Sequence, residues 1–251
     1  MRHRLALSVL IAVLASGCDK EDPSRFQGYV EGEYVRIGAP VGGRLQTLSV
    51  ARGATVTAGA PLFALEPAPE QQAVADAQAR VQWADAQLKR NEELRGKGWV
   101  SAEQLDAART EHDRARPQLA QAQWQLAQKS VSATVAGVVE DTYYRVGEWV
   151  PPGAPVVSLL PPENRVVRFF VPEARVSQVK LGQAVRVNVD GAVQPINATV
   201  SYIAPRAEYT PPVIYSREAR AKLVFLIEAR PAPADAVALH PGQPVDVSLT
   251  P

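Results

Sequence analysis

The sequence predicts a mainly β protein that carries an inserted α-helical hairpin. Three observations support this fold class. Apolar residues recur with heptad spacing between residues 70 and 130, a pattern typical of paired helices. Residues 39–67, before this stretch, recur as residues 133–161 after it. Beyond residue 162, short alternating segments and frequent prolines indicate a small β-barrel.

Composition places the chain among ordinary globular proteins without a strong charge. Its 251 residues include 27 Lys and Arg against 26 Asp and Glu, a formal net charge of +1. This balance gives no electrostatic basis for binding nucleic acid or an acidic membrane surface. The length suits one large domain or two to three small ones. The single cysteine, Cys18, excludes an intrachain disulfide.

Residues 1–17 are predicted to be a lipoprotein signal peptide. Basic residues open the segment, an apolar run covers residues 5–14, and three small residues end directly at Cys18. The apolar run is too short for a good transmembrane span. The pattern resembles a bacterial lipoprotein signal, which implies lipidation of Cys18. The alternative is ordinary signal cleavage that leaves Cys18 free.

The residues after Cys18 suggest where such a lipoprotein is retained. Asp19 resembles the acidic residue that keeps lipoproteins at the inner membrane in many envelope-sorting systems. Residues 18–25 form a predicted polar tether. The predicted location is the periplasm, with acyl chains in the inner membrane in place of a transmembrane helix.

Residues 26–67 are predicted to hold a first barrel strand and the first half of a β-sandwich. Short apolar segments separated by Gly and Pro indicate small strands joined by tight turns. Residues 39–67 align without a gap on residues 133–161, at an offset of 94 residues. The recurring glycines require the same turn geometry in both copies, and the recurring apolar residues supply equivalent core positions. The second half of the sandwich is therefore predicted at residues 132–162.

Residues 68–131, between the two halves, form the predicted hairpin. The heptad seam positions are Val74, Ala77, Val81, Ala84 and Leu88, then Leu105, Ala108, His112, Ala115, Leu119, Ala122 and Leu126. An antiparallel arrangement places large seam residues opposite small ones, which lets the helices pack closely. Gly96 and Gly98 are available for the positive φ of a tight reversal. Ser101 with Gln104 fits a capping box, and Pro117 is expected to bend the second helix.

Residues 163–251 are predicted to form the β-barrel. The alternating segments at residues 165–171, 185–189, 198–203, 222–227 and 245–249 fit strands. A short helix is predicted at residues 173–179. The long connection at residues 207–215 is either a functional loop or a plain surface loop.

The order of these parts resembles the HlyD-type periplasmic adaptor family, also called membrane fusion proteins. The resemblance covers residues 30–249 and is carried by the half-motif Gly43-Arg44-Leu45 with Gly59-Ala60-Pro61-Leu62, the hairpin, the second half-motif and the barrel. It implies a split lipoyl-like β-sandwich and a homo-oligomeric ring. It also implies an adaptor subunit that links an inner-membrane transporter to a TolC-like outer-membrane channel in efflux or secretion. Residues 168–173 and 209–218 look most like the branch that accompanies ABC exporters.

The resemblance further implies a docking site at the hairpin tip. Family members that dock on a TolC-like channel carry an Arg, a Leu four residues on and a Ser seven further. Arg90, Leu94 and Ser101 have that spacing. Arg90 and Leu94 share one helix face, and Ser101 faces them across the turn. The alternative is that Arg90 is solvated, Leu94 closes the seam and Ser101 is only an N-cap.

The split β-unit also resembles lipoyl and biotinyl carrier domains. Carriers present a modified lysine on the tight turn between their two halves, and here the hairpin replaces that turn. Lys97 lies between glycines at the hairpin tip, in no carrier motif. A carrier function would require Lys89, Lys97 or Lys129 to be lipoylated or biotinylated.

No enzyme, cofactor or metal site is predicted. His3, His112 and His240 lack the spacing of a metal site or a catalytic triad, and His112 is expected to pack in the helical seam. The chain has no Gly-rich phosphate loop, so ATP hydrolysis would belong to a partner. The remaining alternative to an adaptor is an envelope lipoprotein that binds a ligand or serves as a scaffold without taking part in export.

Overall fold

The computed structural model describes residues 25–192, 194–209 and 223–250. It divides the chain into two compact units, each with its own hydrophobic core. One unit is Tyr34–Pro161, and the other combines the chain before Tyr34 with Pro162–Pro251. The predicted signal peptide, Cys18, Asp19 and most of the tether lie outside the described residues.

The first unit contains a β-sandwich of two four-stranded sheets. Its strands are β2 (Val35–Gly38), β3 (Gly43–Leu48), β4 (Thr55–Val56), β5 (Pro61–Leu65), β6 (Ser130–Ser132), β7 (Gly137–Thr142), β8 (Trp149–Val150) and β9 (Pro155–Leu160). One sheet has the order β2-β9-β7-β4, and the other has β6-β5-β3-β8. Both sheets combine strands from the two sequence copies, so neither copy could form the core alone.

The sequence repeat is reproduced strand by strand. An offset of 94 residues carries β3 onto β7, β4 onto β8 and β5 onto β9, and it carries the end of β2 onto β6. The strand neighbours correspond in the same way, because β2-β9-β7-β4 becomes β6-β5-β3-β8. The turn glycines Gly53 and Gly147 both have positive φ, as do Gly59 and Gly153. The predicted equivalence of the turns is confirmed.

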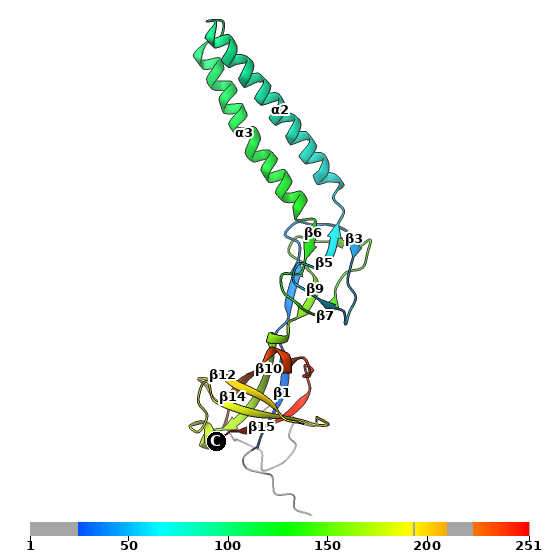
Figure 1. Cartoon of the computed structure of the whole chain (residues 1–251), viewed down its shortest axis with the longest axis vertical. Helices are drawn as coiled ribbons and strands as arrows, with labels where there is room; N and C mark the ends of the chain where they lie inside the picture. The colour runs from blue at the N-terminus through cyan, green and yellow to red at the C-terminus, as the bar shows by residue number, and fades with distance from the viewer. Residues whose placement is uncertain (1–24, 193, 210–222, 251) are drawn as a thin grey trace, which may run out of the picture. The chain divides into compact units, whose positions relative to one another are not determined.

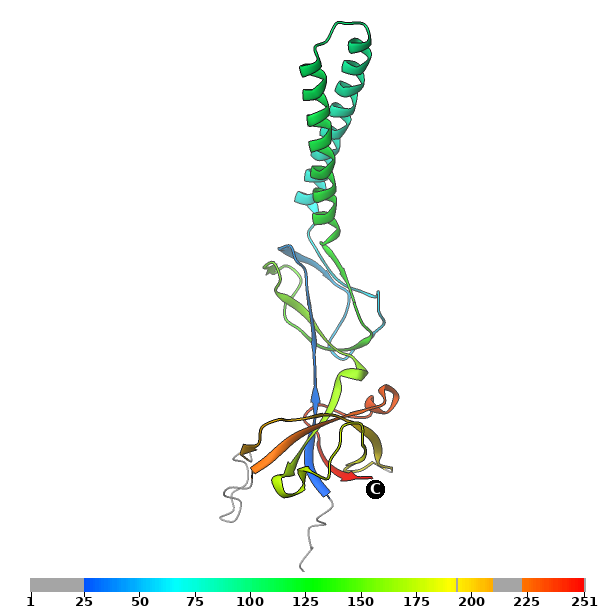
Figure 2. The same ribbon diagram turned by 90° about the vertical axis from the view of Figure 1, so that its left-hand side faces the viewer.

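Two antiparallel helices separate the copies: α2 (Ala68–Gly96) and α3 (Ala102–Ala127) (Figures 1 and 2). Their buried residues are four seam alanines, Ala77, Ala84, Ala115 and Ala122. The larger seam side chains are partly buried beside them. This burial confirms the predicted seam and explains the small residues, since alanine lets the two backbones approach.

The ends of the helices match the prediction except at one glycine. Ser101 and Gln104 form the predicted capping box at the start of α3. Gly98 takes a positive φ of 77° in the reversal. Gly96 does not share this role, because it is still within α2. The helix α3 runs through Pro117 without interruption.

The second unit is a closed six-stranded barrel. Its strands are β1 (Arg25–Gly32), β10 (Arg165–Pro172), β11 (Ala184–Val189), β12 (Ile196–Ile203), β14 (Leu223–Pro231) and β15 (Pro244–Leu249). The order β10-β1-β15-β11-β12-β14 closes through pairing of β10 with β14. The barrel core includes Phe169, Ile227 and Leu239, all fully buried. Together with the inserted hairpin, this barrel and the sandwich confirm the predicted fold class.

Short elements of the barrel unit differ from the prediction. Glu208–Tyr209, placed in a long loop by the sequence, forms the strand β13 and pairs with the start of β14. The rest of that loop, residues 210–215, lies outside the described residues, as do residues 210–218 of the segment that resembles the ABC-exporter branch. The short helix α4 covers only Glu173–Val176. The helices η1 (Pro162–Asn164) and α5 (Pro233–Ala236) have no counterpart in the prediction, because four residues or fewer leave no periodicity to detect.

Within the described residues, no helix combines the length and apolar character needed to cross a membrane.

Candidate docking site at the hairpin tip

The three predicted docking residues lie around the reversal at the tip of the hairpin. Arg90 and Leu94 are in the last two turns of α2, and Ser101 is the N-cap of α3. The Leu94 carbonyl accepts hydrogen bonds from the backbone N–H groups of Lys97 and Trp99, both at 3.1 Å. These bonds close the reversal tightly, so the residues on its two sides are held at the same end of the hairpin.

Exposure differs among the three residues. The side chains of Arg90 and Ser101 are exposed, and that of Leu94 is partly buried. The Ser101 hydroxyl accepts a hydrogen bond from the Gln104 backbone N–H at 3.1 Å, and the Ser101 N–H donates to Gln104 Oε1 at 3.0 Å. Ser101 is therefore an N-cap in this structure. The cap uses its hydroxyl oxygen as an acceptor and does not use the hydroxyl proton, which a partner's acceptor can take.

Two tryptophans that the sequence analysis did not single out border the same site. Trp99 is 74% exposed in the reversal, and Trp83 is 56% exposed on α2. Both line a groove between the helices near the tip, with Gln87, Val100, Ala108 and Glu111. Exposed tryptophan is costly in water and is enriched in protein–protein interfaces. A tryptophan at a non-seam position of the heptad was the sequence signal for Trp83.

The groove and the predicted docking residues share one side of α2. Trp83, Gln87, Arg90 and Leu94 follow one another at steps of four, three and four, which keeps them on one helix face. A partner in contact with Arg90 and Leu94 would therefore also meet Trp83. The candidate site extends along the arm for about three helical turns.

Contacts between residues of the reversal stabilise its conformation. Arg95 Nη1 donates a hydrogen bond to the Val100 carbonyl at 3.0 Å. Lys97 Nζ lies 5.4 Å from the centre of the Trp99 ring, within the range of a cation–π interaction. Val100 is buried, whereas its neighbour Trp99 is exposed. The backbone of the tip is thus fixed while its largest apolar side chain remains available.

His112 occupies the seam, as the heptad predicts. Its Nε2 lies 3.0 Å from Asp85 Oδ1 on the facing helix, and its Nδ1 lies 2.9 Å from Asp113 Oδ1. The Asp85 carboxylate is also 3.6 Å from Arg116. These contacts fix the alignment of the two helices. In the part of the chain that the structure describes, no three His, Cys, Asp or Glu residues gather as a metal site would require.

The outer surface of the barrel holds a second polar network. Arg168 on β10 lies 3.1 Å from Glu31 on β1, and its Nε donates to Glu228 on β14 at 2.9 Å. Burial lowers the pKa of Arg168, but the hydrogen bond to Glu228 and the nearby carboxylates outweigh it and raise that pKa overall. The network joins three strands of the closed barrel, which is a structural role.

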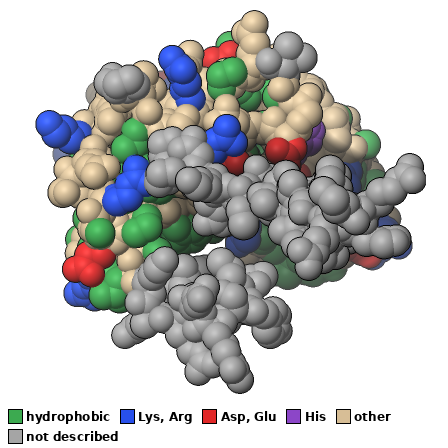
Figure 3. Space-filling view, turned by 90° about the horizontal axis from the view of Figure 1, so that it is seen from below, with side chains coloured by type: hydrophobic (Ala, Val, Ile, Leu, Met, Phe, Trp, Pro, Cys, Tyr) green, Lys and Arg blue, Asp and Glu red, His purple; other side chains and the backbone are tan. Residues whose placement is uncertain are grey.

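On the face shown in Figure 3, the visible Lys and Arg side chains are separated by hydrophobic and other side chains. At the hairpin tip, the exposed side chains of Arg90 and Trp99 lie beside one tight reversal.

Comparisons with known proteins agree with this architecture. No protein-family profile matches the chain. The UPF0194 membrane protein YbhG of Salmonella gallinarum is 27% identical in an alignment 317 positions long, gaps included, which covers 98% of this chain and 96% of the relative. The membrane fusion protein Spr0693 of Streptococcus pneumoniae R6 is similar in structure, with a TM-score of 0.71 and 22% identity over 90% of this chain and 98% of that one.

A second solved structure is informative about the hairpin. A MacA–MexA chimeric protein that contains the α-hairpin domain of Pseudomonas aeruginosa MexA matches with a TM-score of 0.70. The match has 20% identity and covers 90% of this chain and 80% of the chimera. At these identities, the structural likeness shows a common fold. The chain thus has the fold of membrane fusion proteins, with a sandwich, a barrel and an α-hairpin.

Proposed function

We propose that the chain is an HlyD-type periplasmic adaptor, a subunit of an efflux or secretion system that links an inner-membrane transporter to a TolC-like outer-membrane channel. The observation that carries this proposal is the long two-helix arm inserted between the halves of a split β-sandwich. The arm leaves most of both helices exposed, and its tip is rigid. Such an element suits contact with another protein better than it suits a core.

The proposed mechanism is non-catalytic. Cys18 anchors the chain to the inner membrane through its lipid, and the barrel and sandwich of several copies assemble into a ring on the transporter. The hairpins then extend toward the channel. The sequence segments at residues 168–173 and 209–218 favour an ABC-type transporter as the partner. The transporter, rather than this chain, sets the identity of the exported molecule.

At the tip, each predicted residue offers a different contact. Arg90 supplies a charged hydrogen-bond donor, Leu94 an apolar side chain and Ser101 a hydroxyl. Trp83 and Trp99 add exposed aromatic area beside them. This combination of a charge, an apolar centre and aromatic neighbours fits a contact with helical ends of a channel protein.

The proposal is tested by export in cells that depend on the chain. We expect Leu94→Asp and Arg90→Glu to abolish or strongly reduce export without loss of folding, because each removes a tip contact. Lys89→Glu is the matched control: it makes the same charge change on a neighbouring exposed residue of another helix face. Export that survives both tip variants would disprove tip docking.

A deletion separates the adaptor from the scaffolding alternative. If loss of the whole chain leaves efflux and secretion unchanged, the transport function itself is wrong and an envelope scaffold is favoured. Crosslinking followed by purification should recover an inner-membrane transporter with the wild-type chain.

A further inference from the structure

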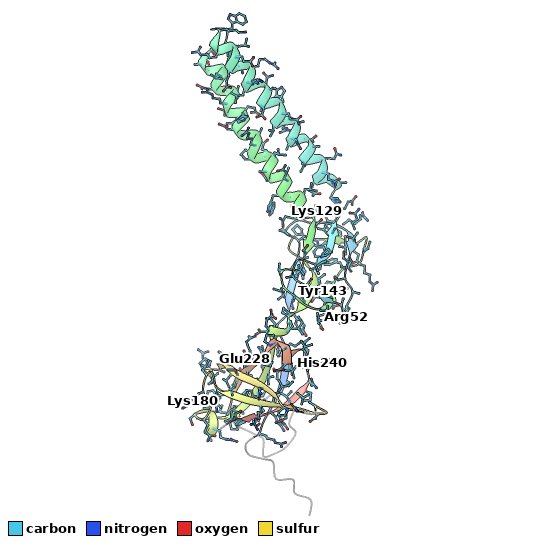
Figure 4. All side chains as sticks on the ribbon, viewed as in Figure 1. Arg52, Lys129, Tyr143, Lys180, Glu228 and His240 are labelled. Atoms are coloured by element: carbon cyan, nitrogen blue, oxygen red, sulfur yellow. The ribbon has the colours of Figure 1, made fainter. Side chains whose placement is uncertain are left out.

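A buried lysine joins the hairpin to the sandwich. Lys129 lies between the end of α3 and the start of β6, and it is only 3% exposed (Figure 4). Its Nζ lies 2.8 Å from Glu70 Oε1, in the first turn of α2. The same Nζ donates to the Gly42 carbonyl of the sandwich at 2.8 Å. One ammonium group therefore holds the bases of both helices and the loop before β3.

The sandwich is shaped to accept this ammonium group. A Cβ atom added to Gly43 would lie 2.9 Å from Lys129 Nζ, closer than real Cβ contacts allow. The absence of a side chain at Gly43 thus leaves the space that the lysine occupies. The Lys129 backbone takes part as well, because its carbonyl accepts a hydrogen bond from the Leu65 N–H at 2.8 Å.

The position equivalent to Lys129 in the other half of the sandwich holds no lysine. One repeat earlier, the position of Lys129 is occupied by Val35 (129 − 94 = 35). Val35 pairs with Leu159, as Lys129 does with Leu65, the residue one repeat before Leu159. The copy without a hairpin carries an apolar residue there. The lysine occurs where the two helices join the sheet.

The energetics also argue against a purely stabilising role. Removing two charges from water costs free energy that a single contact seldom recovers, so well-packed apolar pairs often stabilise as much or more. Glu70 Oε2 is buried without a hydrogen-bond partner in the described structure, so part of the desolvation cost of the carboxylate is not offset. In some proteins a buried polar or ionic pair instead selects one arrangement of the elements that it joins, because its partners meet only in that arrangement.

We propose that Lys129 is a positioning residue, and that the Lys129–Glu70 ion pair fixes the angle at which the hairpin leaves the sandwich. The consequence for docking rests on the proposed function. The 29 residues of α2 make a lever of about 43 Å, so a rotation of about 10° at its base moves the tip by about 8 Å. That displacement exceeds the separation of about 4–4.5 Å within which apolar side chains are in contact.

A nearby ion pair provides a matched control. Arg44 lies 3.8 Å from Glu66, also close to the base of the hairpin, but both side chains are more than half exposed. Water and salt screen this contact, and it cannot impose one geometry. Glu66→Gln therefore removes a carboxylate four residues before Glu70 without touching the buried pair.

The test measures distances within the purified mature chain, with Cys18→Ser as background. Spin labels at Thr57→Cys in the sandwich and Ala86→Cys on α2 report the hairpin angle, since both positions are exposed. Residue 86 lies about 27 Å along α2, so a freed rotation of about 10° adds about 5 Å to the width of the distance distribution. We expect Lys129→Met and Glu70→Gln to widen the distance distribution by about 5 Å. Glu66→Gln should leave the distribution as narrow as in the background chain.

The double variant Lys129→Met/Glu70→Met separates orientation from stability. We expect it to fold with an unchanged melting temperature and yet to show the wide distribution, because apolar packing replaces the pair without its direction. A narrow distribution in the double variant would overturn the proposal. These measurements need no transporter, so the angle and the adaptor function succeed or fail independently.

Discussion

At the scale of single residues, Ser101 combines two roles that the sequence could not separate. Its hydroxyl caps α3 through Gln104, and the same hydroxyl belongs to the proposed docking set. Loss of export after a simple deletion of the side chain would therefore be ambiguous. A substitution that keeps the cap and changes the surface removes that ambiguity.

We predict that Ser101→Ala lowers the free energy of unfolding by about 1 kcal/mol, because the first turn of α3 loses an acceptor. Ser101→Asp should retain stability, since aspartate caps as well as serine and favours the positive end of the helix dipole. Urea denaturation of both variants measures the difference. If the small neutral hydroxyl makes the docking contact, cells that carry Ser101→Asp should lose export. Full export by Ser101→Asp would leave Ser101 as a cap only.

At the scale of the elements, the hairpin depends on its small residues. Ala84 is 1% exposed in the seam of α2, and Ala115 is 2% exposed in the seam of α3. The two helices bury little else completely, so their separation is set by these alanines.

Enlarging one of the alanines should force the helices apart. We predict that Ala84→Leu costs about 1–3 kcal/mol of stability through overpacking. Ala86→Leu is the control on the exposed face of the same helix and should change stability by less than about 0.5 kcal/mol. Thermal unfolding followed by circular dichroism at 222 nm compares them. Equal losses for the two variants would show that the seam is not closely packed.

Local patterns in the sequence accounted for much of these elements. The heptad seam and the capping box depend on residues a few positions apart, and the 94-residue repeat depends on a match that can be seen without coordinates. The groove at Trp83 and Trp99 and the contact of Lys129 with Glu70 depend on residues that the fold brings together. No periodicity marks such pairs. Lys129 in particular was considered only as a possible modification site, whereas the structure buries it.

At the scale of the whole molecule, the proposal assigns attachment to the membrane to Cys18, because three small residues at the end of the predicted signal peptide stand directly before it. A single acyl chain binds a membrane weakly, and a bacterial lipoprotein anchor with several chains binds firmly.

We predict that Cys18→Ser moves the chain from the membrane fraction to the soluble periplasmic fraction, because no acyl chains can be attached. Cys18→Ser/Ser24→Cys is the control. It keeps one cysteine near the N-terminus but away from the predicted cleavage position, so it should remain soluble. Fractionation with immunoblotting, and mass spectrometry of the N-terminal peptide, measure both. A Cys18→Ser chain that still sediments with membranes would show that another contact retains it.

The doubled sandwich has a consequence for how such proteins change. In the repeat, β5 is equivalent to β9, and β6 is equivalent to β2. The chain leaves the sandwich after β5 and after β9 and enters it at β2 and at β6, so the two pairs of strand ends correspond. The hairpin is attached at one pair of strand ends, and the barrel strands continue from the other. The hairpin and the barrel strands are thus attached to the sandwich at equivalent positions of the repeat. We expect a hairpin of another length to leave the core of the eight strands unchanged, because no residue of α2 or α3 is among the buried residues of that core.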